Sequence, residues 1–303
     1  MMLRRASIWA GCIVGLCALL YFVYPPFRYS TWVAAGRSAV CPWNQAVQVE
    51  AHTANLMGVK DRILKASHLV RTDGPLELWE TPKGQYWVPA GNRYVLPFNL
   101  AEMEEQIYGS GETFIHAGDI VLDCGASDGD FTKEALKSGA KLVVSVEVSP
   151  NSVECIRRNL RREIEQGRVI VYPKGVWDKD DVLQLRVSDT NFAANSVALR
   201  PEGSHTDVQV PLTTVDKLVE ELKLPRVDFI KMDIEGAEVK ALSGARNAIA
   251  KYKPRISIAA EHKPDDEVTI PAAIHQIRQD YRLRCGPCSA SEGRIRPDIL
   301  YFY

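Results

Sequence analysis

The chain lacks an excess of charge of either sign. Its 303 residues include 37 lysines and arginines against 38 aspartates and glutamates, which leaves a formal net charge of −1. A protein that binds nucleic acid through the phosphate backbone usually has a clear basic excess. The near-neutral balance therefore disfavours this class, and we expect no nucleic-acid partner.

Internal repeats and low-complexity tracts are also absent, and the seven cysteines follow no regular spacing. Two cysteines lie in an apolar N-terminal stretch, and the remaining odd number does not indicate the disulfide framework of a secreted protein. Cys285 and Cys288 have the spacing of a redox motif, but they lie near the C-terminus between two strand-like runs. We therefore expect a turn with two thiols.

The N-terminus lacks charge, because no charged residue occurs between Arg5 and Arg28. As a helix, residues 6–27 would reach about 33 Å, which is enough to cross the hydrocarbon core of a membrane. Pro25 and Pro26 would end this helix, because proline lacks a backbone donor and clashes with the preceding turn. Bulky residues follow the apolar core where a signal peptide would have small ones, so we favour a transmembrane anchor over a cleaved signal segment.

The rest of the chain has an ordinary globular composition, with 46% hydrophobic and 25% charged residues. We interpret residues 38–110 as an N-terminal lead-in. It contains a helical pattern at 47–67, an alternating pattern at 76–91 that predicts a β-hairpin, and a predicted helix at 100–108 with Asn99 as its N-cap.

Residues 111–303 have the pattern of one α/β domain. Short runs rich in Val and Ile are typical of strands that are buried on both faces. Such strands are predicted at 120–124, 142–148, 169–172, 229–233 and 256–260. Helical patterns follow at 131–138, 152–166, 215–222, 237–250 and 270–279. This alternation predicts a parallel sheet, and the final runs 281–285 and 299–303 should pair as an antiparallel hairpin at its edge.

A glycine-rich turn follows the first predicted strand. It reads DCGASDGDFT from Asp123 to Thr132, and glycines at such a turn let the backbone approach a ligand closely. The acid before the first glycine would repel the pyrophosphate of a dinucleotide, and the spacing differs from GxGxxG. A cationic ligand fits better, and S-adenosylmethionine (SAM) has both a sulfonium and an amino group.

The next two predicted strands also end in residues that suit this ligand. Glu147 lies about 20 residues beyond the glycines, where an acid binds ribose hydroxyls in related folds. Val176 and Trp177 follow the third strand, and a ligand lying across the strand ends would bring its adenine against them. Packing in the core is an equally good interpretation of Trp177.

Ionisable residues gather at the end of the fourth predicted strand. Lys231, Asp233 and Glu235 alternate and so share one face, and Glu238 follows in the first helical turn. Such groups beside a buried strand are costly unless they are paired or functional, and a lysine–carboxylate pair with a helix cap is the structural alternative. His262 follows the fifth strand at the same edge, where it could accept a proton from a hydroxyl or serve as a structural histidine.

Five segments occur in the order VLDCGASDGDFT, VVSVEVSP, LTTVDKL, VDFIKMDIEGAEVKALSGA and ISIAAEH. Together they resemble the FkbM-type family of SAM-dependent methyltransferases. The resemblance implies a class I methyltransferase, Rossmann-like fold: a mostly parallel seven-stranded sheet with an antiparallel last strand and helices on both faces. It also implies SAM as the cofactor and methyl transfer to a hydroxyl oxygen of a small molecule or glycan. Cys124, Ser127, Asp128 and Asp130 depart from the commoner DVGANIGxFT form of the first motif.

The motifs and the resemblance together give the candidate site. The expected SAM-binding residues are Asp123, Gly125, Ala126, Ser127, Gly129, Phe131, Glu147, Val176 and Trp177. The expected catalytic residues are Asp233, His262 and Lys231, and the expected substrate-binding residues are Glu235 and Glu238. We predict no metal ion, and a divalent ion held by Asp233, Glu235 and His262 is the less favoured alternative.

Basic residues lie on both sides of the apolar segment, so the charge bias toward exporting the domain is slight. The supply of SAM and the unpaired cysteines favour the cytoplasm, and we expect a membrane-anchored enzyme with a cytoplasmic catalytic domain. Loops such as 188–209 would contact the acceptor. Two alternatives remain: a nicotinamide-dependent oxidoreductase, which the glycine spacing disfavours, and a non-catalytic, membrane-tethered binding module on a methyltransferase-like fold.

Overall fold

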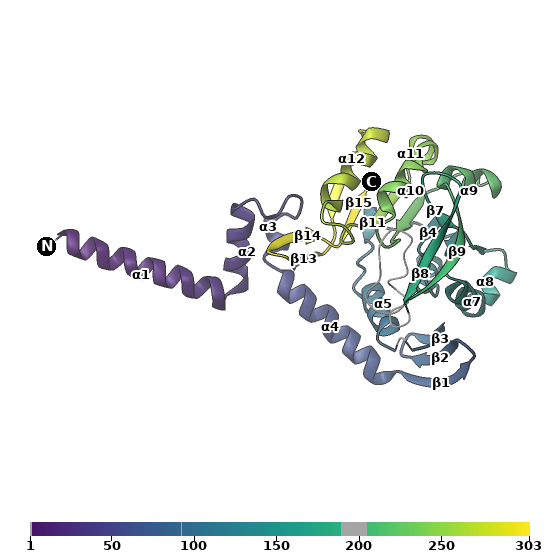
Figure 1. Cartoon of the computed structure of the whole chain (residues 1–303), viewed down its shortest axis with the longest axis horizontal. Coiled ribbons are helices and arrows are strands. Elements are labelled where there is room, and N and C mark those ends of the chain that lie inside the picture. Colours follow the sequence, from purple (N-terminus) through teal and green to yellow (C-terminus); the bar gives the residue numbers. More distant parts are fainter. Residues whose placement is uncertain (1, 92, 189–204) are drawn as a thin grey trace.

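A seven-stranded sheet forms the centre of the molecule in the computed structural model, which describes residues 2–91, 93–188 and 205–303 (Figure 1). Its strand order is β12-β15-β11-β10-β4-β5-β6. The strands are β4 (Ile120–Cys124), β5 (Leu142–Val146), β6 (Val169–Tyr172), β10 (Phe229–Met232), β11 (Arg255–Ala259), β12 (Leu283–Cys285) and β15 (Ile299–Phe302). Neighbouring strands from β11 to β6 are parallel, whereas β15 is antiparallel to both β11 and β12. The expected α/β fold with an antiparallel last strand is therefore confirmed.

Helices cover both faces of this sheet. They are α6 (Asp130–Lys137), α7 (Pro150–Asn159), α8 (Arg161–Glu165), α9 (Val215–Glu221), α10 (Glu238–Ser243), α11 (Arg246–Tyr252) and α12 (Asp266–Ile277). Side chains alternate across a strand, so Leu122 of β4 joins a hydrophobic cluster with α9 to α12, while Val121 joins a second cluster with α6. Burial on both faces explains why these strands are continuous apolar runs.

The predicted helix 237–250 is two helices, because the chain breaks at Gly244 between α10 and α11. A Cβ atom at Gly244 would lie 2.0 Å from the carbonyl oxygen of Trp177. The backbone of the neighbouring loop therefore occupies the space of a side chain at this point. The predicted helix 152–166 is likewise divided into α7 and α8.

A second, smaller sheet was not predicted. It consists of β7 (Gly175–Val176), β8 (Asp181–Ser188) and β9 (His205–Thr213), in the order β7-β9-β8. β8 and β9 pair antiparallel from Asp181↔Leu212 to Ser188↔His205. The alternating apolar residues of β8 were a usable signal. Residues 189–204, within the predicted acceptor loop 188–209, lie outside the described residues.

The lead-in contains the expected hairpin and long helix. Its elements are α4 (Val49–Ala66), β1 (His68–Asp73), β2 (Leu76–Thr81), β3 (Gly84–Pro89), α5 (Val95–Glu104) and the 3-10 helix η1 (Gly111–Thr113). The expectation of a helix at 100–108 capped by Asn99 was wrong, because Asn99 lies inside α5. The helix begins earlier because Leu96 and Leu100 pack with Ile63 of α4.

A disulfide joins Cys41 to Cys288, residues separated by 247 positions. The expectation of a turn with two thiols was therefore wrong for Cys288, whereas Cys285 is a buried free thiol. The bridge fastens the segment before α4 to the hairpin of β13 (Cys288–Ser291) and β14 (Arg294–Pro297). Two further bonds hold the same segment, from the Cys285 thiol to the Val40 carbonyl (3.1 Å) and from the Ile295 amide to the Arg37 carbonyl (2.9 Å).

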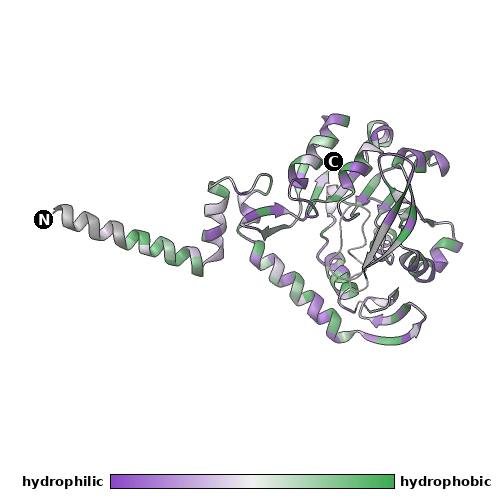
Figure 2. Ribbon diagram, viewed as in Figure 1, coloured by the Kyte–Doolittle hydropathy of each residue, from purple (hydrophilic) through white to green (hydrophobic). Residues whose placement is uncertain are grey.

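The N-terminal elements are the helices α1 (Met2–Val23), α2 (Pro25–Ala34) and α3 (Trp43–Ala46). Helix α1 extends away from the body of the protein, and its second half is strongly apolar (Figures 1 and 2). The expected single transmembrane helix is not supported, because among the described residues no single helix passes a test of length and hydropathy for crossing a membrane. Only the pair Cys12–Val23 and Pro25–Ala34 passes together, with a bend of 106° between the two helices. Pro25 does not simply end the apolar segment, because it begins α2, where its missing amide costs nothing.

Candidate functional site

A cavity opens at the carboxyl ends of β4, β5 and β10, where ligands bind in open α/β sheets. Its empty volume is about 980 Å³. The wall includes the glycine-rich turn, the ends of β5 and β7, the loop after β10, and helix α5 of the lead-in.

The glycine-rich turn is in close contact with the loop after β10. Gly125 has φ +83°, and a Cβ atom there would lie 1.8 Å from the carbonyl oxygen of Asp233. Only glycine combines this left-handed backbone with so close an approach. The Lys231 ammonium donates a hydrogen bond to the Gly125 carbonyl at 2.8 Å, which holds the two loops together from below.

Glu147 ties the turn to the end of β5. Its Oε2 accepts a hydrogen bond from the Ser127 amide, and its Oε1 accepts bonds from the amides of Val148 and Ser149, all at 2.8 Å. Burial raises the pKa of Glu147, and these three amide donors oppose that rise. The carboxylate thus shapes the wall at the position predicted for the ribose.

Asp123 lies beneath the cavity rather than in its wall. The side chain is fully buried, its Oδ2 accepts a hydrogen bond from the Thr132 hydroxyl at 2.6 Å, and its Oδ1 lies 3.7 Å from the Lys231 ammonium. Burial raises the pKa of Asp123 to about 6, against the opposing effects of Lys231 and Thr132. Burial alone would lower the pKa of Lys231, but the carboxylates of Asp233 and Asp123 raise it above its ordinary value.

The structure divides the residues predicted to bind SAM into two groups. Those that line the cavity are Gly125, Ser127, Phe131, Glu147 and Val176. Those outside the lining are Asp123, Ala126, Gly129 and Trp177. Ala126 packs with Ile156 of α7, and Trp177 packs against Val210 of β9, which favours the core interpretation of Trp177.

Four lining residues come from the lead-in and were not predicted to belong to the site: Asn99, Glu102, Met103 and Tyr108. The buried Tyr108 hydroxyl donates a 2.6 Å hydrogen bond to Asp233 Oδ2. Burial raises the pKa of Asp130, and a hydrogen bond from Asn99 is among the interactions that oppose this rise. Sequence reasoning had no signal for these residues, because their role depends on how α5 packs on the sheet.

The acidic residues after β10 surround His262. Its Nδ1 lies 2.9 Å from Glu238 Oε1, and its Nε2 lies 3.5 Å from Asp233 Oδ1 and 3.7 Å from Glu235 Oε2. Burial alone would lower the pKa of His262, but the three carboxylates raise it to about 10. Burial raises the pKa of Glu235 to about 7. Burial also acts to raise the pKa of Asp233, but Lys231 and His262 hold it below its usual value.

Among the residues predicted for chemistry and substrate binding, Lys231, Asp233 and Glu235 line the cavity. Glu238 and His262 lie behind them. Glu238 is only 1% exposed, and its Oε1 also accepts a 3.0 Å hydrogen bond from the Ile234 amide. The structure thus brings all five side chains together, with Glu238 in contact with His262 rather than with the cavity.

The family model of the methyltransferase FkbM domain matches residues 123–286, from the glycine-rich turn to the first residues after β12. The chain belongs to the FkbM methyltransferase family. A search of curated proteins finds no match. This match agrees with the resemblance of the five sequence segments to FkbM-type methyltransferases.

Solved structures with a similar fold include other methyltransferases. Methyltransferase FkbM from Methylobacillus flagellatus KT is 20% identical, with a TM-score of 0.48, and the match covers 84% of this chain and 60% of that one. The chain therefore spans less than two thirds of that protein. A precorrin-6y C5,15-methyltransferase from Geobacter metallireducens GS-15 is 12% identical over 67% of this chain and 84% of that one, with a TM-score of 0.37. A Streptococcus mutans protein in complex with SAH is 10% identical over 67% of this chain and 97% of that one, with a TM-score of 0.40.

Proposed function

We propose that this FkbM-family protein uses SAM to methylate a hydroxyl oxygen of a small molecule or glycan. The observation that supports this most strongly is the arrangement of the cavity. The glycine-rich turn and Glu147 form one part of its wall, and Lys231, Asp233 and Glu235 form another. One cavity thus offers a cofactor half and an acceptor half side by side.

The cofactor half suits a cation with a ribose. Gly125 and Ser127 present backbone close to the cavity, Glu147 lies where ribose hydroxyls would bind, and the carboxylates of Asp130 and Asp233 add negative charge to the wall. SAM, when bound, supplies a methyl group that is already activated by its positive sulfur. The work of the protein is then mainly to hold the two reactants in line.

The acceptor half suits a hydroxyl group that must lose a proton. Asp233 lines the cavity and lies between Lys231, at 3.9 Å, and His262, at 3.5 Å. Tyr108 fixes its other oxygen. We assign the proton acceptor to Asp233, with His262 and Lys231 holding that carboxylate in position.

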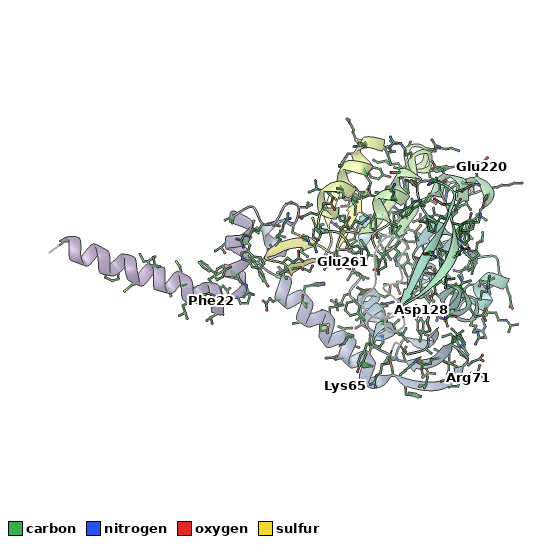
Figure 3. All side chains as sticks on the ribbon, in the orientation of Figure 1. Phe22, Lys65, Arg71, Asp128, Glu220 and Glu261 are labelled. Atoms are coloured by element: carbon green, nitrogen blue, oxygen red, sulfur yellow. A yellow bond between two sulfur atoms is a disulfide. The ribbon has the colours of Figure 1, made fainter. Side chains whose placement is uncertain are left out.

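Membrane attachment is a second part of this proposal. The large apolar side chains that are exposed on α1 are Trp9, Ile13, Val14, Leu16, Leu19, Phe22 and Val23. Figure 3 shows Phe22 apart from the body of the protein. A patch of this kind is typical of contact with lipid, and the bent pair α1–α2 supplies the length.

The side of the membrane is also part of the proposal. Unpaired cysteines no longer support the cytoplasm, because Cys41 and Cys288 form a disulfide and such bridges are rare there. The supply of SAM still favours the cytoplasm, and for that reason we place the catalytic domain at the cytoplasmic face.

The proposal is tested by a thermal-shift titration of the purified chain with SAM. A ligand that binds the folded state raises the melting temperature with concentration. Absence of any shift at millimolar SAM contradicts the proposed cofactor. A shift without methyl transfer to any acceptor supports the alternative of a non-catalytic binding module.

A further inference from the structure

The buried charges at the acceptor end of the cavity include an oxygen that lacks a partner. Glu238 is 1% exposed, and its Oε2 accepts no hydrogen bond from the described part of the chain. A buried carboxylate oxygen without a partner is costly, by about 1–3 kcal/mol or more. The other oxygen of the same carboxyl group, Oε1, lies beside a second ligand-type atom, His262 Nδ1.

Three side chains from separate segments converge around the carboxyl group of Glu238. Asp233 comes from the loop after β10, Glu238 from the first turn of α10 and His262 from the loop after β11. Each offers one ligand atom, and these atoms lie within 4.8 Å of one another. Among the described residues, this is the group of histidine, cysteine or carboxylate side chains that meets that geometry.

The separations suit ligands of a shared ion. Two ligand atoms that each lie about 2.1 Å from one metal ion are separated by roughly 3.0–3.5 Å at octahedral or tetrahedral angles. The Nδ1 atom of His262 lies 2.9 Å from Glu238 Oε1, whereas its Nε2 atom, on the other side of the ring, lies 3.5 Å from Asp233 Oδ1. One ion binds only one of these nitrogens, so the imidazole must turn or one carboxylate must move to close the shell around an ion.

From this geometry we infer that Asp233, Glu238 and His262 form a site for a divalent cation, with Glu235 at its rim. Two carboxylates and an imidazole are a mixed oxygen and nitrogen set, which suits Mn²⁺ and its neighbours better than Ca²⁺. Binding the ion displaces a proton from the imidazole. The sequence-based prediction of no metal is replaced by this proposal.

The location gives the ion a role that rests on the proposed function. Asp233 and Glu235 line the cavity, so an ion behind them is reached from the acceptor half. An acceptor hydroxyl that completes the shell of the ion would lose its proton more easily, and because Asp233 would then hold the ion, that proton would pass to water. The oxygen would then attack the methyl carbon, and SAM would leave as the neutral thioether.

The test uses the full-length chain in detergent, after treatment with a chelator and dialysis. Free Mn²⁺ is measured by electron paramagnetic resonance during a titration, and SAM affinity is measured on the same samples. We expect one Mn²⁺ per chain, with affinity at least tenfold weaker in Glu238→Gln and in His262→Gln. The matched control is Glu267→Gln, because Glu267 is also 1% exposed with an unpartnered Oε2 but lies on α12, in an ion pair with Arg294. This control should bind Mn²⁺ as the unmodified chain does.

The outcomes separate this inference from the proposed function. If the chain binds SAM but not Mn²⁺, the cation site is overturned and the proposed function still stands. The protonated His262 is then the cation among these carboxylates. Equal Mn²⁺ affinity in the unmodified chain and both site variants also overturns it. Mn²⁺ binding without SAM binding keeps the site and refutes the function. If one variant loses SAM binding through misfolding, the other variant decides.

Discussion

Gly125 is the residue at which the two loops of the site come closest. Two separate features favour glycine at this position. Its φ is +83°, and an ideal Cβ would lie 1.8 Å from the Asp233 carbonyl oxygen. Gly118 has a similar φ of +89° but nothing within 4 Å of its ideal Cβ. The two positions therefore allow backbone strain and steric clash to be measured apart.

We predict that Gly125→Ala is more destabilising than Gly118→Ala. Both variants suffer the left-handed penalty of about 1–2 kcal/mol, and only Gly125→Ala also forces the turn away from the loop after β10. Urea denaturation of both variants measures the difference. Equal losses of unfolding free energy would show that the two loops are not in contact.

Asp123 gives the stability a predictable dependence on pH. Its pKa is about 6 in the folded protein against 3.8 for the free side chain, so between these values the folded state holds a proton that the unfolded state has lost. The contribution of this group to stability is complete below about pH 4 and is lost as the pH rises through 6.

Asp123→Asn should therefore become more stable relative to the unmodified chain as the pH rises from 4 to 6. The change in the difference of unfolding free energy is on the order of 1–3 kcal/mol. Denaturation curves at pH 4, 5, 6 and 7 measure it. A difference that stays constant across this range would mean that the pKa of Asp123 is not raised.

The sequence predicted much of the site at this scale, and the reason is local. Gly125, Glu147 and Asp233 each lie at or next to the carboxyl end of a predicted strand, and parallel strands bring these ends to one edge of the sheet. Tyr108 and the contact between Glu238 and His262 were not predictable in the same way. They depend on the packing of segments that are distant in the sequence, and a single amino-acid sequence does not show such contacts.

The helices and strands were likewise predictable where the local sequence determines the structure. The five parallel strands were predicted within two residues at each end, because a strand buried on both faces is a continuous apolar run. The prediction of one helix over 237–250 failed at Gly244, where α10 has ended and an ideal Cβ would lie 2.0 Å from the Trp177 carbonyl oxygen. It also missed β8 and β9, since no strand was predicted there and the predicted acceptor loop 188–209 overlaps the first half of β9.

The clearest test at the scale of elements concerns the segment before α4. If the Cys41–Cys288 bridge fastens it to β13, alkylation of the unfolded, unreduced chain should modify five thiols: Cys12, Cys17, Cys124, Cys155 and Cys285. The Cys41→Ser variant should lose stability, because the bridge closes a long loop, and entropy estimates for such loops are about 3–5 kcal/mol.

Mass spectrometry of the alkylated chain gives the count. Seven modified thiols in the purified chain would contradict the bridge. A second sample is taken from cells whose thiols are trapped with acid before lysis. Five modified thiols in that sample would contradict the cytoplasmic placement of the domain, because a reducing compartment would keep Cys41 and Cys288 reduced.

The whole molecule combines an extended apolar helix with a globular α/β body (Figures 1 and 2). We predict that Leu16→Lys together with Leu19→Lys reduces the share of the chain in the membrane fraction severalfold. Both side chains are more than half exposed on α1, and placing charge in lipid is costly.

The control is Met57→Lys, which introduces one lysine at a residue that is 39% exposed on α4. Flotation of cell extracts on a density gradient measures the distribution of each variant. A similar distribution of all three chains would mean that α1 does not attach the protein to lipid.

The central claim is that one cavity holds SAM on one side and an acceptor hydroxyl on the other. The most direct test incubates the full-length chain with methyl-labelled SAM and glycan or membrane extracts, and then identifies the labelled product. We predict a methyl ether on a hydroxyl oxygen, at least a hundredfold less of it with Asp233→Asn, and an unchanged yield with the control Asp280→Asn, which lies outside the cavity lining. Label on nitrogen or carbon would contradict the acceptor class, and no labelled product from a chain that binds SAM would contradict the account as a whole.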